Sequence, residues 1–265
     1  MDYTEFFHVE FDKKTRIVLL TIAKRDDKYN LFGASFIRAL KDLLEHYELN
    51  REIKGLILTA EGDRVFSTGA DISGVFGDLD SFSARDFSKY GQEVFRMLEN
   101  APYVTLAAIN GFALGGGLEI CLACDFRIAS RKARLGLPEI NLGIIPGWGG
   151  TQRLPRIIGL ERALYLILSG EPITAEKALE WGLVSLVVEP ENLVAEAKKF
   201  LAKLVGDKSG DAIRVAKRSV IQGINSSLAE GLNLESELFG LIWASPDREE
   251  GVKAFLEKRK PRFTS

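Results

Sequence analysis

Two glutamates in apolar segments are the residues of this sequence best suited to chemistry. Glu119 lies in the apolar run LEICLAC, and Glu139 lies in the segment LGLPEINLG. Burying a lone carboxylate costs several kcal/mol unless it is paired or serves a function. Two such groups can have their pKa values pushed apart, so that one acts as an acid and the other as a base near neutral pH. We interpret them as proton-transfer groups, with a buried structural ion pair as the alternative for Glu119.

A cluster of glycines precedes the first of these glutamates. In NGFALGGGLEI an apolar strand pattern ends, three glycines follow, and a helix pattern begins. Such a junction presents unpaired backbone N–H groups at a helix N-terminus, which favours negative charge. Glu119 follows Gly116 by one helical turn and should face whatever binds those amides. The segment therefore predicts an oxyanion site, although the glycines could instead serve only to pack the helix tightly on a sheet.

A second turn, Thr68-Gly69-Ala70 in VFSTGADIS, breaks a strand pattern just before an acidic residue and could offer another N–H to the same oxygen. The signatures of serine hydrolases, P-loop proteins, dinucleotide-binding proteins and H-E-x-x-H metalloenzymes do not occur. With two histidines in the chain, a serine or cysteine nucleophile has few bases available. Proton transfer by carboxylates is the mechanism that remains.

The two cysteines, Cys121 and Cys124, have the C-x-x-C spacing of metal and redox sites. A zinc site needs further cysteine or histidine ligands, yet His8 and His46 lie far away in the sequence. Both cysteines stand among apolar residues, so we expect them to be small core side chains and expect no metal site.

The elements that must position these residues follow two patterns. Short apolar runs rich in isoleucine, leucine and valine predict strands, largely parallel or mixed, at residues 16–23, 53–60, 103–109, 126–129 and 184–188. Helical spacing between residues 36 and 47 predicts a strand, helix, strand unit. Beyond about residue 190 the apolar spacing predicts helices at 192–204, 212–223, 228–243 and 247–258, the last with Ser245 as N-cap and Pro246 at its first position.

Length and charge limit the class of protein. The chain has 265 residues, 46% of them hydrophobic, which is ordinary for a globular protein of one or two domains. Its net charge of −2 makes nucleic acid an improbable partner. The acidic start lacks a signal-peptide pattern, and the apolar runs are short of the ~20 residues of a membrane span. We expect a cytoplasmic protein without membrane contact.

Four segments together resemble the enoyl-CoA hydratase/isomerase (crotonase) family over nearly the whole chain: FSTGADIS, NGFALGGGLEICLACDFRIAS, GLPEINLGIIPGWGGTQRLPR and EGVKAFLEKRKPRF. The resemblance implies an α/β fold, a spiral of repeated strand, strand, helix turns. It places the spiral core with the acyl-CoA site in residues 1–195 and a helical trimerisation region in 196–265. It also implies a homo-oligomer, either a trimer or a dimer of trimers.

The resemblance also implies roles for individual residues. The N–H groups of Ala70 and Gly116 would form the oxyanion hole for the thioester oxygen. Glu119 would deprotonate water for attack at Cβ, and Glu139 would protonate Cα. The substrate, an acyl-CoA thioester, would further contact residues around these turns, namely Ala70, Asp71, Ile72, Ser73, Gly116, Gly147 and Trp148.

Two features of the sequence depart from the family pattern or leave a choice open. The N-terminal block reads YNLF, and Ser73 stands where a lysine is common, so the phosphate contacts of coenzyme A are predicted at Lys28, Lys258 and Arg259. Trp148 would border the acyl pocket and favour short chains, or else pack the loop.

The function predicted is enoyl-CoA hydratase: reversible syn addition of water to a trans-2-enoyl-CoA, giving a 3-hydroxyacyl-CoA. No cofactor is expected, since coenzyme A is part of the substrate. One alternative is a Δ3,Δ2-enoyl-CoA isomerase, which the presence of two glutamates disfavours, or another acyl-CoA lyase of the family. A second alternative is a non-catalytic acyl-CoA-binding or RNA-binding member of the fold.

Overall fold

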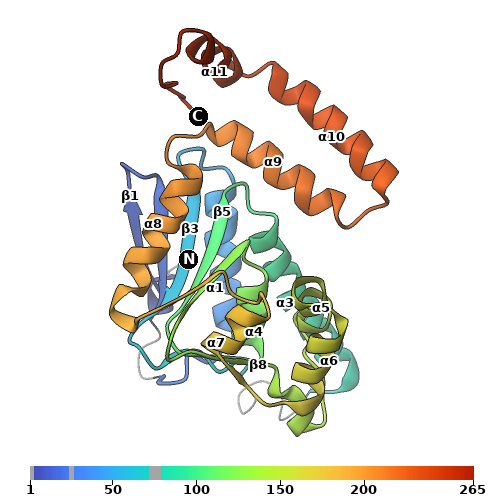
Figure 1. Cartoon of the computed structure of the whole chain (residues 1–265). Coiled ribbons are helices and arrows are strands. Elements are labelled where there is room, and N and C mark those ends of the chain that lie inside the picture. Colours follow the sequence, from blue (N-terminus) through green and yellow to red (C-terminus); the bar gives the residue numbers. More distant parts are fainter. Residues whose placement is uncertain (1–2, 24–26, 72–78) are drawn as a thin grey trace.

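The computed structural model describes residues 3–23, 27–71 and 79–265 of the chain. Two β-sheets and the helices around them form the larger body of the molecule. A helical arm made of α9 (Gly210–Gly223), α10 (Leu228–Trp243) and α11 (Pro246–Leu256) projects from one end of that body (Figure 1).

The larger sheet has six strands in the order β1-β2-β3-β5-β7-β10. Their bounds are β1 (Phe7–Asp12), β2 (Ile17–Ile22), β3 (Gly55–Ala60), β5 (Val104–Ile109), β7 (Phe126–Ser130) and β10 (Leu186–Val188). β1 pairs antiparallel with β2, and the other neighbours run parallel. The five predicted strands are confirmed, and so is the parallel unit of β2, α1 (Ala34–Glu48) and β3. The edge strand β1 was not predicted, because its polar and apolar residues alternate in a short run.

Both faces of this sheet are covered, which explains the almost continuous apolar character of its strands. In β2, Ile17 and Leu19 face α8 (Leu193–Val205), whereas Val18 and Leu20 face the larger core. Helix α8 therefore packs on the sheet as part of the body, and the division expected at residue 195 falls inside it. The arm begins after α8, at α9.

A second sheet has four short strands in the order β4-β6-β8-β9, with bounds Val65–Ser67, Phe112–Leu114, Arg134–Gly136 and Ile173–Thr174. β4, β6 and β8 run parallel, and β9 is antiparallel to β8. The chain passes from β3 to β4, from β5 to β6 and from β7 to β8, so each pass adds one strand to each sheet. This repetition is the spiral of strand, strand, helix turns that the family resemblance implied.

Helices fill the spaces around the two sheets. They are α1, α3 (Ser81–Glu99), α4 (Gly116–Leu122), α5 (Gly150–Ile158), α6 (Leu160–Ser169), α7 (Ala175–Glu180) and α8, with 3-10 turns η1 (Tyr3–Glu5), η2 (Pro138–Leu142) and η3 (Pro190–Asn192). None of the helices within the described ranges has the length and apolarity to cross a membrane.

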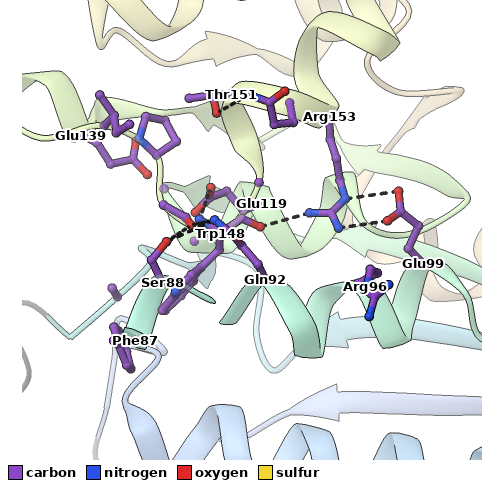
Figure 2. Close-up of a pocket in the computed structure, with 18 of the residues that line it drawn as sticks. Phe87, Ser88, Gln92, Arg96, Glu99, Glu119, Glu139, Trp148, Thr151 and Arg153 are labelled. Carbon is purple, nitrogen blue, oxygen red and sulfur yellow. Dashed lines mark hydrogen bonds and ion pairs between the residues drawn. The ribbon is translucent and has the colours of Figure 1, made fainter. Parts of the chain in front are cut away.

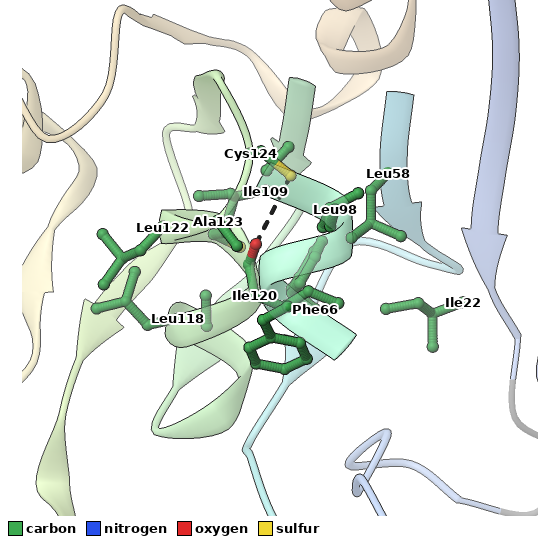
Figure 3. Packing of buried hydrophobic residues seen from close by; sticks show 14 of the residues in the cluster. Ile22, Leu58, Phe66, Leu98, Ile109, Leu118, Ile120, Leu122, Ala123 and Cys124 are labelled. Atoms are coloured by element: carbon green, nitrogen blue, oxygen red, sulfur yellow. Dashed lines mark hydrogen bonds between the residues drawn. The ribbon is translucent and has the colours of Figure 1, made fainter. Parts of the chain in front are cut away.

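Helix α4 lies at the centre of the core, and every one of its residues is buried. Figure 3 shows its apolar side chains among those of neighbouring strands and of α3. The Cys121 and Cys124 thiols are free and buried, and they donate to the Gly117 and Ile120 carbonyls. The described part of the chain holds no group of three histidine, cysteine or acidic side chains arranged for a metal. The cysteines are thus core residues, as predicted.

The arm is built from strongly capped helices. Ser227 forms a capping box with Glu230 at the start of α10, and Ser245 caps α11 with Pro246 at its first turn, as predicted. Lys217 of α9 joins the arm to the body, because its Nζ lies 2.8 Å from Asp125 and donates to the Tyr103 carbonyl at 2.9 Å.

Candidate active site

The candidate residues follow three neighbouring parallel strands of the smaller sheet. Ala70 comes after β4, Gly116 after β6 and Glu139 after β8, while Glu119 lies one turn into α4. Since the carboxyl ends of parallel strands meet at one edge of a sheet, this order brings segments distant in sequence together. A cleft of about 990 Å³ opens at this edge, and all four residues line it.

Glu119 is buried and is bound by backbone groups. Its side chain is 2% exposed, and its Oε1 accepts hydrogen bonds from the N–H groups of Trp148 and Gly150, both at 2.8 Å. Burial, and after it the charge of Glu139, raise the pKa of Glu119 to about 7, although the two N–H donors oppose this rise. Its partners are amides and not a cation, so the alternative of a structural ion pair is not supported. Both of these bonds are made by Oε1, and no described residue donates to Oε2.

Glu139 lies in η2 and is partly buried. Its Oε2 is buried without a hydrogen-bond partner among the described residues, and burial raises the pKa of Glu139 to about 7. Its Oε1 faces Gly115, where an added Cβ would lie 3.1 Å away. Gly115 also has φ +53°, a region that favours glycine. The glycine segment before α4 therefore lies against Glu139, and the helix that it starts carries Glu119.

Two backbone amides face the same part of the cleft. A Cβ added at Gly116 would lie 3.6 Å from the Ala70 nitrogen, so the two turns are in close contact. Gly69, with φ +98°, makes the turn before Ala70, and Phe32 holds it by donating to the Gly69 carbonyl at 2.8 Å. Neither the Ala70 nor the Gly116 N–H has an acceptor within the described part of the chain. The cleft thus holds two backbone N–H groups, in neighbouring turns, that are free to bind a ligand.

Trp148 both packs the loop and lines the cleft. Its side chain is 4% exposed and contacts the rings of Phe87 and Phe95 edge-on, with centroids 5.5 and 5.6 Å away. The indole lies against Gly91 of α3 and against Gly116, where an added Cβ would come within 2.3 and 2.5 Å of it. This role of Gly91 was not predicted, although a glycine inside a helix pattern is a signal of close packing.

Polar side chains of α3 and α5 hold the loop that carries Trp148, and sequence analysis missed these as well (Figure 2). Ser88 and Gln92 donate to the Gly147 carbonyl at 2.6 and 2.8 Å. Arg153 donates to the Trp148 carbonyl at 3.1 Å and forms an ion pair with Glu99 at 3.0 Å.

The remaining predicted contacts differ in their placement. Gly147 lines the cleft, whereas Asp71, Lys28, Lys258 and Arg259 are not among its lining residues. Lys28 lies over the Tyr29 ring, and Arg259 pairs with Glu250 and Glu257. Ile72 and Ser73 lie outside the described residues. The phosphate contacts stay a prediction. The arm, by contrast, reaches the cleft through Ile221, Gln222 and Asn225 of α9 and its following turn.

Comparison with known proteins shows that this chain is similar to enoyl-CoA hydratases over nearly its whole length. A sequence model of the enoyl-CoA hydratase/isomerase family matches residues 12–265. The crotonyl-CoA hydratase of Syntrophomonas wolfei is 39% identical over 97% of this chain and 98% of its own, and the short-chain-enoyl-CoA hydratase of Clostridium acetobutylicum is 38% identical over 97% of both. The crystal structure of enoyl-CoA hydratase from Bacillus anthracis superposes with a TM-score of 0.90 at 37% identity, covering 97% of this chain and 98% of that one.

Proposed function

The chain belongs to the enoyl-CoA hydratase/isomerase family, and from this premise we propose how its cleft carries out the reaction. The protein is an enzyme, a hydro-lyase that adds water reversibly and in syn geometry to a trans-2-enoyl-CoA, giving a 3-hydroxyacyl-CoA. The observation that carries the assignment of the site is one cleft that holds a buried and a partly buried carboxylate together with two backbone amides that no described residue accepts from.

The amides of Ala70 and Gly116 are proposed to bind the thioester oxygen. As the water oxygen bonds to Cβ, the electrons of the double bond move toward the carbonyl, and this oxygen gains negative charge. Amides already held in place stabilise that charge without reorganisation. Their turns are in close contact and their N–H groups are unpaired in the described structure, which supports this role.

The two glutamates are proposed to move the protons. Burial raises the pKa of both glutamates, but only Glu119 has two N–H donors that favour its ionised form. We therefore propose that Glu119 is the one that rests as the carboxylate and takes a proton from water through Oε2. The buried, unpartnered Oε2 of Glu139 favours the protonated form, which donates to Cα. Water thus supplies OH to Cβ, and Cα gains the proton of Glu139. At the end Glu119 is protonated and Glu139 ionised, and exchange with solvent restores both.

The substrate is an acyl-CoA thioester, and we propose a short acyl chain like those named for the two bacterial relatives. Because each proton transfer has its own carboxylate, the proposed reaction uses no separate cofactor. The cytoplasmic location remains a prediction.

We further propose that the arm joins copies of the chain into a trimer or a dimer of trimers. Large apolar side chains on α10, such as Phe239, Leu241 and Trp243, are more than half exposed in the single chain. Burial of such a surface against another copy would remove it from water.

The test is the loss of enoyl-thioester absorbance when the purified protein acts on crotonyl-CoA. Glu119→Gln and Glu139→Gln should each lower kcat by about 10²- to 10⁴-fold, the usual contribution of a general acid or base. Glu93→Gln, at an exposed position of α3, is the matched control and should keep the wild-type rate. An inactive wild type that instead converts a 3-enoyl-CoA would replace hydration with isomerisation.

A further inference from the structure

The peptide unit between residues 147 and 148 is held from both sides. In a planar trans peptide the C=O and N–H groups point in opposite directions. On one side, the Gly147 carbonyl accepts from Ser88 Oγ at 2.6 Å and from Gln92 Nε2 at 2.8 Å. On the other side, the Trp148 N–H donates to Glu119 Oε1 at 2.8 Å. The two α3 side chains therefore fix the direction of an N–H that Glu119 accepts.

The second donor to Glu119 is fixed in a different way. The Gly150 N–H belongs to the peptide whose carbonyl, on Gly149, accepts from the backbone N–H groups of Gln152 and Arg153 at 3.0 and 2.8 Å. These bonds form the first turn of α5, so that peptide is held by the start of a helix. Of the two donor peptides, it is the 147–148 peptide that depends on side chains of another element for its orientation.

We propose that Ser88, together with Gln92, is a positioning residue of the hydratase: it orients the 147–148 peptide so that the Trp148 N–H stabilises the carboxylate of Glu119. The inference rests on the proposed function of Glu119 as the base. Ser88 acts through the peptide and need not touch the reacting atoms.

Other charged groups also act on Glu119, and they are unchanged when Ser88 is altered. Glu139 of η2 raises its pKa, while Arg153 of α5, which pairs with Glu99 of α3, lowers it. Loss of Ser88 and Gln92 weakens one N–H donor and leaves these charges in place. The carboxylate then becomes less stable relative to its protonated form, and the pKa of Glu119 rises.

The experiment compares kcat/KM for crotonyl-CoA from pH 5 to pH 9 in the wild type, Ser88→Ala and the Ser88→Ala/Gln92→Leu double variant. On the acidic side of this profile, which we call the acidic limb, kcat/KM falls as Glu119 becomes protonated. In the double variant this limb should lie about 0.5 to 1 pH unit higher, so kcat/KM at acidic pH should be about 3- to 10-fold lower than in the wild type. Ser88→Ala should move it less, because Gln92 still donates to Gly147. Ser88→Thr, which keeps a hydroxyl, should restore the wild-type limb.

Ser236→Ala is the matched control, since Ser236 also donates to a carbonyl, that of Leu232, but on the remote helix α10. A substrate-free measurement accompanies the rates: the free energy of unfolding should begin to fall at the same pH in both proteins, but in the double variant the fall should end at a pH higher by the same amount. An unmoved limb and an unmoved stability profile, even with lower rates or a lower Tm, would overturn the inference. A wild type without hydratase activity would instead refute the proposed function, and the stability profile would still decide the inference.

Discussion

Replacing Glu119 by glutamine should stabilise the protein at pH 8 while it abolishes most of the activity. The pKa of Glu119 is raised from an ordinary 4.5 to about 7 by burial and by Glu139. A tenfold change in proton affinity between the folded and unfolded states is equivalent to about 1.4 kcal/mol, so ionisation of this group destabilises the folded state by about 3 kcal/mol. Glutamine keeps an oxygen for the two N–H donors and carries no charge.

The sign of the pH dependence follows from the raised pKa. Below about pH 4.5 the carboxyl is protonated in both states and makes no difference to stability. As the pH rises from 4.5 to about 7, the unfolded chain loses this proton first, and the free energy of unfolding of the wild type falls. Above pH 7 the loss is complete. The variant should show no such contribution, so its advantage should grow across this window.

The assay is urea unfolding at one fixed protein concentration, at pH 5 and at pH 8, for the wild type and Glu119→Gln. The exposed variant Glu93→Gln is the control and should follow the wild type at both pH values. If Glu119→Gln is less stable than the wild type at pH 8, or if its advantage is the same at both pH values, the reasoning about the buried carboxylate is wrong.

Two further predictions concern packing and the arm. Gly91→Ala should lower stability by about 1–3 kcal/mol and reduce activity, because the new Cβ would lie 2.3 Å from the indole of Trp148. Gly240→Ala, in α10 with nothing within 4 Å of the added carbon, should instead raise stability by about 0.5–1 kcal/mol in the same urea assay. Lys217→Met should lower the free energy of unfolding by about 3 kcal/mol, because Asp125 is only 13% exposed and would lose its cation. Lys203→Met, on the exposed side of α8, is the control and should change little. Both are measured by guanidinium unfolding. Equal effects of the two glycine variants would contradict the packing argument, and equal effects of the two lysine variants would contradict the argument from the buried ion pair.

Long periodic elements could be predicted from the sequence, and short ones could not. Helix α10 begins and ends at the predicted residues, since its apolar spacing and its capping serine are local signals. The strands β4, β6 and β8 have three residues each, too few to predict how they pair, although a strand pattern was recognised at β4. Their pairing places Ala70, Gly116 and Glu139 at one edge. The sequence suggested that the two turns serve one oxygen, and the family resemblance supplied the individual roles.

Some residues of the candidate site could likewise be predicted from the sequence, and others could not. Glu119 and Glu139 could be found because a carboxylate in an apolar segment conflicts with its surroundings. Ser88, Gln92 and Glu99 could not, because they look like ordinary polar positions of an amphipathic helix. Their partners, Gly147 and Arg153, lie more than fifty residues away in the sequence, and only the folded chain brings them together.

The reach of α9 into the cleft has a thermodynamic consequence. Ile221 and Gln222 line the space where an acyl-CoA would bind, and the same helix belongs to the projecting arm. The affinity of the cleft for a ligand therefore depends on where the arm lies. A ligand that favours one placement of the arm by a given factor must be favoured by that placement through the same factor. Any contact that fixes the arm, including one made by another copy of the chain, is in this sense an effector of the cleft.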